Sequence, residues 1–196
     1  MPEESKNVAL YARCGFRPDY LTVTLSWPAA PAARLPDHAL WSDLTPKTQE
    51  RLVRETLPQI SAEARPGMDL TPQVRAAAQD GWGETLLLGD PKEPLGFCLV
   101  RTQTKWENRP LTGLSVEVGA LAAGEEDQLD NLLTLLADHA ARLELPHVLL
   151  PVNTIYWPTL EHLLTLGCRI THTRLRMILR QQPPRPNAVD LSTWAA

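Results

Sequence analysis

A short pattern that occurs twice in the chain constrains its fold more than any other feature of the sequence. Residues 10–25 and 162–179 each run from an apolar helix end through a glycine, one apolar residue and an arginine into a strand-like stretch. The matched positions are Gly15 with Gly167, Phe16 with Cys168 and Arg17 with Arg169. Because glycine is common at the residue that follows a helix, the same helix-to-strand ending is predicted at both places.

Hydrophobic periodicity predicts alternating helices and strands around the two copies. Thr45 and Thr71 are each followed by a proline, which favours a helix start at both places. The predicted elements, in order, are a helix at 5–14, a strand at 16–27, helices after Thr45 and Thr71, strands at 85–88, 95–101 and 114–121, a helix at 129–143, a strand at 147–152, a helix at 158–166 and a strand at 168–179. This order predicts an α/β fold with a mixed, mostly antiparallel central sheet flanked by helices.

The composition argues against a nucleic-acid, membrane or metal partner. The formal net charge is −4 at pH 7, and the chain lacks the clustered Lys and Arg that phosphate backbones require. No apolar run approaches the roughly 20 residues that cross a bilayer, and the N-terminus has no signal-peptide pattern. The three cysteines include no CxxC pair, so zinc and redox motifs are unsupported. We therefore expect a soluble, cytoplasmic protein.

The stretch LYARCGFRP at residues 10–18, together with the order of the predicted elements, resembles the GNAT (GCN5-related N-acetyltransferase) superfamily. In that family this pattern lies near the C-terminus of the domain, whereas here it lies at the N-terminus. The resemblance therefore implies a tandem arrangement with a truncated first unit. The expected divisions are the terminal helix and strand of a first GNAT unit at 1–27, a linker at 28–37, a GNAT-like domain at 38–180 and an irregular tail at 181–196.

The resemblance implies an N-acetyltransferase that moves an acetyl group from acetyl-CoA to the amine of a small molecule or a peptide. It implies Tyr11 as the acid that returns a proton to the coenzyme thiolate, and Glu117 as the base. The backbone of Gly119, Leu121 and Ala122 would pair with the pantetheine arm, and Gly124 would belong to the pyrophosphate loop. Glu117 stands between Val116 and Val118, and strand alternation predicts that it faces away from both, toward either the substrate groove or solvent.

Two features depart from the family pattern. Gly124 is the only glycine between Gly119 and Gly167, and the carboxylates of residues 125–127 follow it directly. Carboxylates beside a pyrophosphate repel it by about 1 kcal/mol or more per close pair, whereas at a helix N-terminus they complement the helix dipole. The second departure concerns the tyrosine, because the matching position in the second unit is Leu163, which cannot donate a proton. Tyr156 could replace the family tyrosine as the acid only if the backbone here differed from that of the family. Otherwise we expect Tyr156 to pack beside Trp157.

Two functions remain open from the sequence. The chain is a GNAT N-acetyltransferase or the C-terminal part of one, with a degenerate second unit and catalysis mainly in the first. The alternative is a non-catalytic GNAT-like scaffold or dimerisation module that does not bind CoA. Apolar residues in 1–27 need a cover, which predicts a homodimer, contact with the first unit, or docking of this segment on the second unit's sheet.

Overall fold

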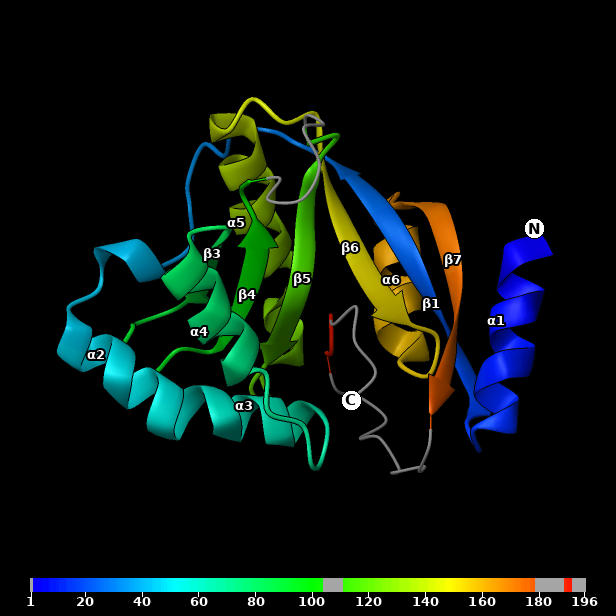
Figure 1. Cartoon of the computed structure of the whole chain (residues 1–196). Coiled ribbons are helices and arrows are strands. Elements are labelled where there is room, and N and C mark those ends of the chain that lie inside the picture. Colours follow the sequence, from blue (N-terminus) through cyan, green and yellow to red (C-terminus); the bar gives the residue numbers. More distant parts are fainter. Residues whose placement is uncertain (1, 104–110, 179–188, 192–196) are drawn as a thin grey trace.

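The strands of the chain form one mixed sheet with helices on both faces (Figure 1), as the sequence predicted. The computed structural model describes residues 2–103, 111–178 and 189–191. In this part of the chain the sheet has seven strands in the order β2-β3-β4-β5-β6-β1-β7. Neighbouring strands are antiparallel except for β5 and β6, which run parallel. The parallel pair places a topological break in the middle of the sheet.

The strands are β1 (Arg17–Pro28), β2 (His38–Leu40), β3 (Gly83–Leu88), β4 (Gly96–Arg101), β5 (Leu114–Leu121), β6 (His147–Asn153) and β7 (Arg169–Ile178). The helices are α1 (Pro2–Arg13), α2 (Pro46–Arg51), α3 (Leu57–Ala64), α4 (Thr71–Asp80), α5 (Leu129–Arg142) and α6 (Trp157–Thr165). A π-helical turn, Leu52–Thr56, joins α2 to α3, and short 3-10 segments precede α2 and α5. The sequence predicted these elements apart from β2, which has only three residues, and α3.

The start of α2 follows directly from its sequence. The Thr45 hydroxyl accepts a hydrogen bond from the backbone N–H of Thr48 at 3.3 Å, and Pro46 occupies the first helical turn. The hydrogen bond satisfies one N–H that would otherwise be unpaired, and the proline has no N–H to satisfy, as expected at a helix N-terminus. Pro58 lies in the first turn of α3, where its missing N–H costs nothing.

The first strand of the chain lies inside the sheet rather than at its edge. β1 pairs antiparallel with β6 on one side and with β7 on the other. Leu25 stands opposite Leu150 of β6 and Ile170 of β7, and its side chain is fully buried. Docking on the sheet, one of the alternatives predicted for this segment, therefore holds for its strand, whereas Leu10 and Tyr11 of α1 stay exposed.

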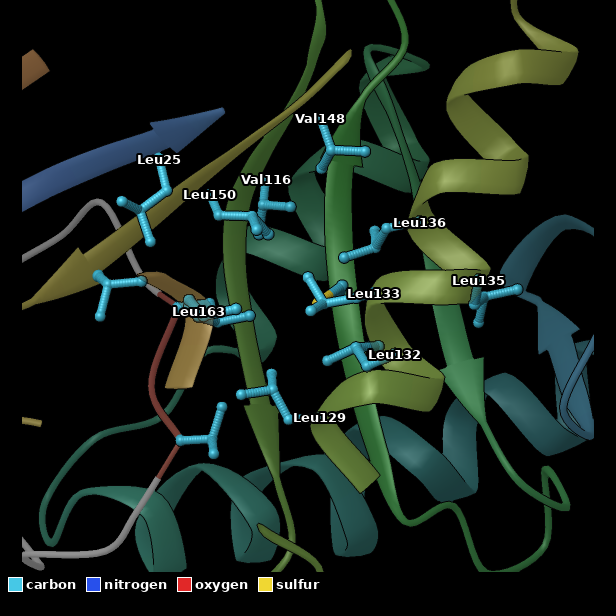
Figure 2. Packing of buried hydrophobic residues seen from close by; sticks show 14 of the residues in the cluster. Leu25, Val116, Leu129, Leu132, Leu133, Leu135, Leu136, Val148, Leu150 and Leu163 are labelled. Atoms are coloured by element: carbon cyan, nitrogen blue, oxygen red, sulfur yellow. The ribbon is translucent and has the colours of Figure 1, made fainter. Parts of the chain in front are cut away.

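Two apolar cores cover the two faces of the sheet. One contains Leu129, Leu132, Leu133 and Leu136 of α5, which pack on the sheet as their helical spacing predicted (Figure 2). The other contains residues of the π-helical turn, α3 and α4. Each fully buried leucine contributes about 1.5–3 kcal/mol relative to an exposed one. In the described part of the chain, no helix combines the length and apolar character needed to cross a bilayer.

Candidate functional site

The candidate site is the gap that opens where β5 and β6 separate. The two strands pair only at Leu114 with Val148 and at Ser115 with Leu149. Beyond these pairs the strands diverge, and residues 189–191 lie between them (Figure 1). The gap leaves one side of the second half of β5 without a neighbouring strand from the sheet itself.

Residues 189–191, here called the C-terminal strap, occupy that side of β5. The N–H of Leu191 donates to the carbonyl of Gly119 at 2.8 Å, and the N–H of Leu121 donates to the carbonyl of Val189 at 3.4 Å. Asp190 stands opposite Ala120 in an antiparallel bridge. The sequence predicted an irregular tail over 181–196; within it the strap forms one isolated bridge, and the rest of that range lies outside the described residues.

The strap side chains alternate between the two faces of the sheet, as in a strand. Val189 and Leu191 are 2% and 0% exposed and belong to the core that includes Leu129 of α5 and Leu163 of α6. Asp190 is 3% exposed, and its carboxylate accepts a hydrogen bond from the Tyr156 hydroxyl at 3.3 Å. Tyr156 is fully buried in the opposite core, beneath α2 to α4.

The loop after β5 binds a carboxylate from within the chain. The N–H of Ala123 donates to Oε2 of Glu63 at 3.0 Å, and Oε1 of Glu63 accepts from the Gln59 amide at 2.8 Å. Gly124 has φ +89°, and a Cβ there would meet nothing within 4 Å. The glycine is therefore required by the turn rather than by a close approach.

Gly119, Leu121, Ala122 and Gly124, the residues expected to bind the coenzyme, come together in this region. Gly119 and Leu121 bond to the strap, while the N–H of Ala122 donates to the carbonyl of Leu95 at 2.8 Å. A Cβ on Gly119 would come within 2.5 Å of the Cys98 sulfur. The sheet itself therefore explains the glycine at 119.

Glu117 lies at a bulge of β5 and is paired. Its Oε1 accepts from Nε of Arg101 at 2.9 Å, and the Arg101 guanidinium lies 4.9 Å from the centre of the Trp82 ring. The pairing register shifts between Leu99 and Val100, where β4 meets this part of β5. Val116 and Val118 consequently face different cores. The expectation that Glu117 faces away from both was wrong, because the bulge interrupts the alternation.

Tyr11 is not brought to this site. It lies on α1, beyond β7 at the far edge of the sheet (Figure 1), and its side chain is 47% exposed. Its ring packs edge-on against Phe16 at 5.6 Å between centroids. The matching residue on α6, Leu163, is fully buried. The structure thus separates the expected acid from Glu117 on β5.

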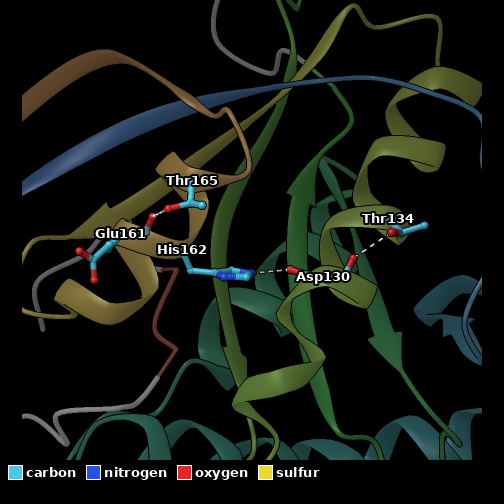
Figure 3. A network of polar contacts seen from close by, with 5 residues as sticks. All are labelled: Asp130, Thr134, Glu161, His162 and Thr165. Carbon is cyan, nitrogen blue, oxygen red and sulfur yellow. Dashed lines mark hydrogen bonds and ion pairs between the residues drawn. The ribbon is translucent and has the colours of Figure 1, made fainter.

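A polar contact that the sequence analysis missed joins the two helices beside the gap. Nε2 of His162 on α6 lies 2.6 Å from a carboxylate oxygen of Asp130 in the first turn of α5 (Figure 3). Both side chains are largely exposed, so the pair contributes at most about 1 kcal/mol. It links α6 to the first turn of α5. Residues 32 positions apart give no local signal for such a pair.

The cysteines offer no activated thiol in the cores. Burial raises the pKa of the Cys98 thiol, and burial raises that of Cys168 to about 11. Both thiols are therefore protonated at neutral pH, and a protonated thiol is a poor nucleophile. Among the residues that the structure describes, no three His, Cys, Asp or Glu side chains are placed to bind a metal ion.

The residues of the gap do not fit acetyl-CoA in this arrangement. The β5 backbone groups that would receive a pantetheine arm are bonded to the strap. The loop amide at Ala123 is bonded to a carboxylate, which stands where a phosphate would need the same donor. The negative charge of Glu63 and of residues 125–127 opposes a pyrophosphate.

The fold is similar to that of solved acetyltransferase-type proteins. A Pyrococcus horikoshii protein provisionally named an acetyltransferase shares 16% identity and matches 97% of this chain with a TM-score of 0.62. A GCN5-related N-acetyltransferase from Sphaerobacter thermophilus shares 14% identity over 93% of the chain, with a TM-score of 0.51. A conserved Staphylococcus epidermidis protein of unknown function shares 14% identity over 86% of the chain, with a TM-score of 0.55. The chain therefore has a GNAT-like fold.

The chain spans only part of these solved proteins, namely 56%, 59% and 64% of their respective lengths. No family model and no curated protein sequence matches it.

Proposed function

We propose that this chain is the C-terminal, non-catalytic unit of a GNAT N-acetyltransferase and that it does not itself bind acetyl-CoA. The observation that carries the proposal is the strap, which bonds to the β5 backbone at the place where this fold would receive the coenzyme. The carboxylate of Glu63 at the loop amide and the leucine at 163 support it. The greater length of the similar solved proteins is consistent with a second unit.

In this proposal the coenzyme and the amine acceptor, a small molecule or a peptide, bind to a preceding GNAT unit. Tyr11 would be the acid of that unit, and Gly119, Leu121, Ala122 and Gly124 would have a structural role in this one. The cytoplasm is the proposed location. Residues 1–27 would belong to the first unit by origin although β1 completes the sheet of the second.

The surface around α1, β1 and β7 is where we place the partner. Within the described ranges β7 is an edge strand of the sheet, and these three elements carry exposed apolar side chains: Leu10, Tyr11, Tyr20, Leu21, Ile170 and Leu175. An unpaired strand edge next to apolar side chains is typical of an interface. The first GNAT unit is the partner we favour, and a homodimer through this surface is the alternative.

Calorimetric titration of the purified chain with acetyl-CoA tests the proposal. We expect no binding at millimolar coenzyme, because the strap and Glu63 occupy the backbone donors and acceptors of the gap. Binding in the micromolar range would contradict the proposal and would favour the second candidate, a catalytically active unit.

The divergence of β5 and β6 is the observation that favours this second candidate, since the family fold uses the gap for its coenzyme. An active unit predicts that Glu117→Gln abolishes acetyl transfer, because the amide cannot accept the amine proton. The control is Glu84→Gln on β3, which removes a carboxylate outside the gap. Under our proposal neither variant changes the rate, because there is no turnover to remove.

A further inference from the structure

We propose that the gap between β5 and β6 is a peptide-binding groove, which takes an extended segment with an apolar–aspartate–apolar pattern and is filled here by the strap of the same chain. The inference stands on the strap contacts and does not require the proposed acetyltransferase partner. It assigns the groove a ligand class, and it implies that a second copy of the strap sequence binds in the same way once the resident strap is released.

The main-chain contacts are those of strand addition. Leu191 donates to Gly119, and Leu121 donates to Val189, on either side of the bridge between Asp190 and Ala120. Ala122 bonds instead to Leu95, which directly precedes β4, and β4 pairs with the other side of β5, so β5 is paired on both sides at this point. Peptides that extend a sheet by this route gain affinity from the backbone and specificity from alternate side chains.

The side-chain contacts give the groove its selectivity. The two apolar strap residues enter the core between α5 and α6, where Leu129 and Leu163 belong to the same cluster. The central aspartate turns to the other face and meets the Tyr156 hydroxyl. A lysine at the central position would remove the carboxylate that accepts from Tyr156 and would bury a cation, and a polar residue at either flank would lose its apolar contacts.

The walls of the groove are built by the fold rather than by the strap. β5 and β6 are held together by two residue pairs at one end, and the contact between Asp130 and His162 links the flanking helices. Tyr156 directly precedes α6 and belongs to the core under α3 and α4, which the strap's apolar residues do not join. A groove whose walls belong to the fold, and whose strand edge is paired only with the strap, is suited to exchange of its occupant.

Amide hydrogen exchange on the unmodified full chain is the first test. The Leu121 and Leu191 amides are expected to exchange at least about 100-fold more slowly than in an unstructured peptide, because each donates to the other strand. Exchange of both amides at the unprotected rate would overturn the proposal, whatever happens to any variant.

The second test releases the resident strap in the full chain with Leu191→Asp, which places a carboxylate in an apolar pocket. A fluorescent peptide spanning residues 187–193 is expected to bind this variant at least about tenfold more tightly than the unmodified chain, whose groove is filled. The same peptide carrying Asp190→Lys is the ligand control. Leu164→Asp, on the exposed side of α6, is the matched protein control and is expected to bind no more peptide than the unmodified chain.

Equal binding of both peptides, or no binding by a folded Leu191→Asp variant, would overturn the proposal. If circular dichroism shows that Leu191→Asp is unfolded, the exchange measurement decides. Acetyl-CoA is added as a competitor, and displacement of the peptide from Leu191→Asp by the coenzyme would refute a groove that is specific for peptides. The proposed function is tested separately, by the coenzyme titration of the unmodified chain.

Discussion

The variant Leu25→Asp is expected to abolish folding or to lower the free energy of unfolding by more than about 5 kcal/mol. Leu25 is fully buried at the middle of β1, between β6 and β7. Its replacement loses about 2–5 kcal/mol of packing and leaves an unpaired carboxylate in the core, which costs about as much again. Since domains of this size are stable by about 5–15 kcal/mol, urea unfolding followed by circular dichroism measures the loss directly.

Leu21→Asp is the matched control for this prediction, because it makes the same change on the same strand. The Leu21 side chain is 43% exposed, so the change is expected to cost no more than about 1 kcal/mol, from the lower strand propensity of aspartate. Similar losses for the two variants would show that β1 is not an internal strand of the sheet in solution. The same control would weaken a homodimer formed through the exposed apolar surface of β1 and β7.

The sequence predicts the order of the elements well because their patterns are local. The spacing of leucines in α5 and the threonine–proline start of α2 each depend on residues within a few positions. The place of β1 depends instead on pairing with residues more than 120 positions away, such as Leu150 and Ile170. Alternation shows that a strand forms and which side is apolar, but it does not identify the neighbouring strands.

The candidate site was harder to predict than the fold for the same reason. The residues expected on β5 and its loop do lie together, since they are consecutive. The strap and Glu63 were missed because a three-residue strand and a single carboxylate carry no periodic signal. The apolar–aspartate–apolar triplet that follows a proline-rich stretch is the only local feature that distinguishes the strap. The bulge at Glu117 was missed because a single extra residue leaves the sequence pattern almost unchanged.

The variant Gly119→Ala is expected to destabilise the chain by about 1–3 kcal/mol, and Cys98→Ala is expected to relieve much of that loss. A Cβ on residue 119 would lie 2.5 Å from the Cys98 sulfur and 3.1 Å from the Phe97 carbonyl oxygen. Overpacking of this kind typically costs about 1–3 kcal/mol. Removing the sulfur leaves only the milder carbonyl contact, so the double variant should show a favourable coupling of about 1–2 kcal/mol.

Gly83→Ala is the control for this cycle, because its Cβ would meet the Val100 carbonyl at 2.7 Å, and residue 83 pairs with Arg101 rather than with Cys98. The loss of unfolding free energy caused by Gly83→Ala should be the same with and without Cys98→Ala. Urea unfolding of the unmodified chain, the two single variants and the double variant measures it. Additive losses for Gly119→Ala and Cys98→Ala would mean that the sulfur does not set the limit. A favourable coupling would show that packing between β4 and β5 suffices to require glycine at 119. Glycine at 119 would then be no evidence for a coenzyme in the groove. That result is consistent with a groove that the chain's own strap fills.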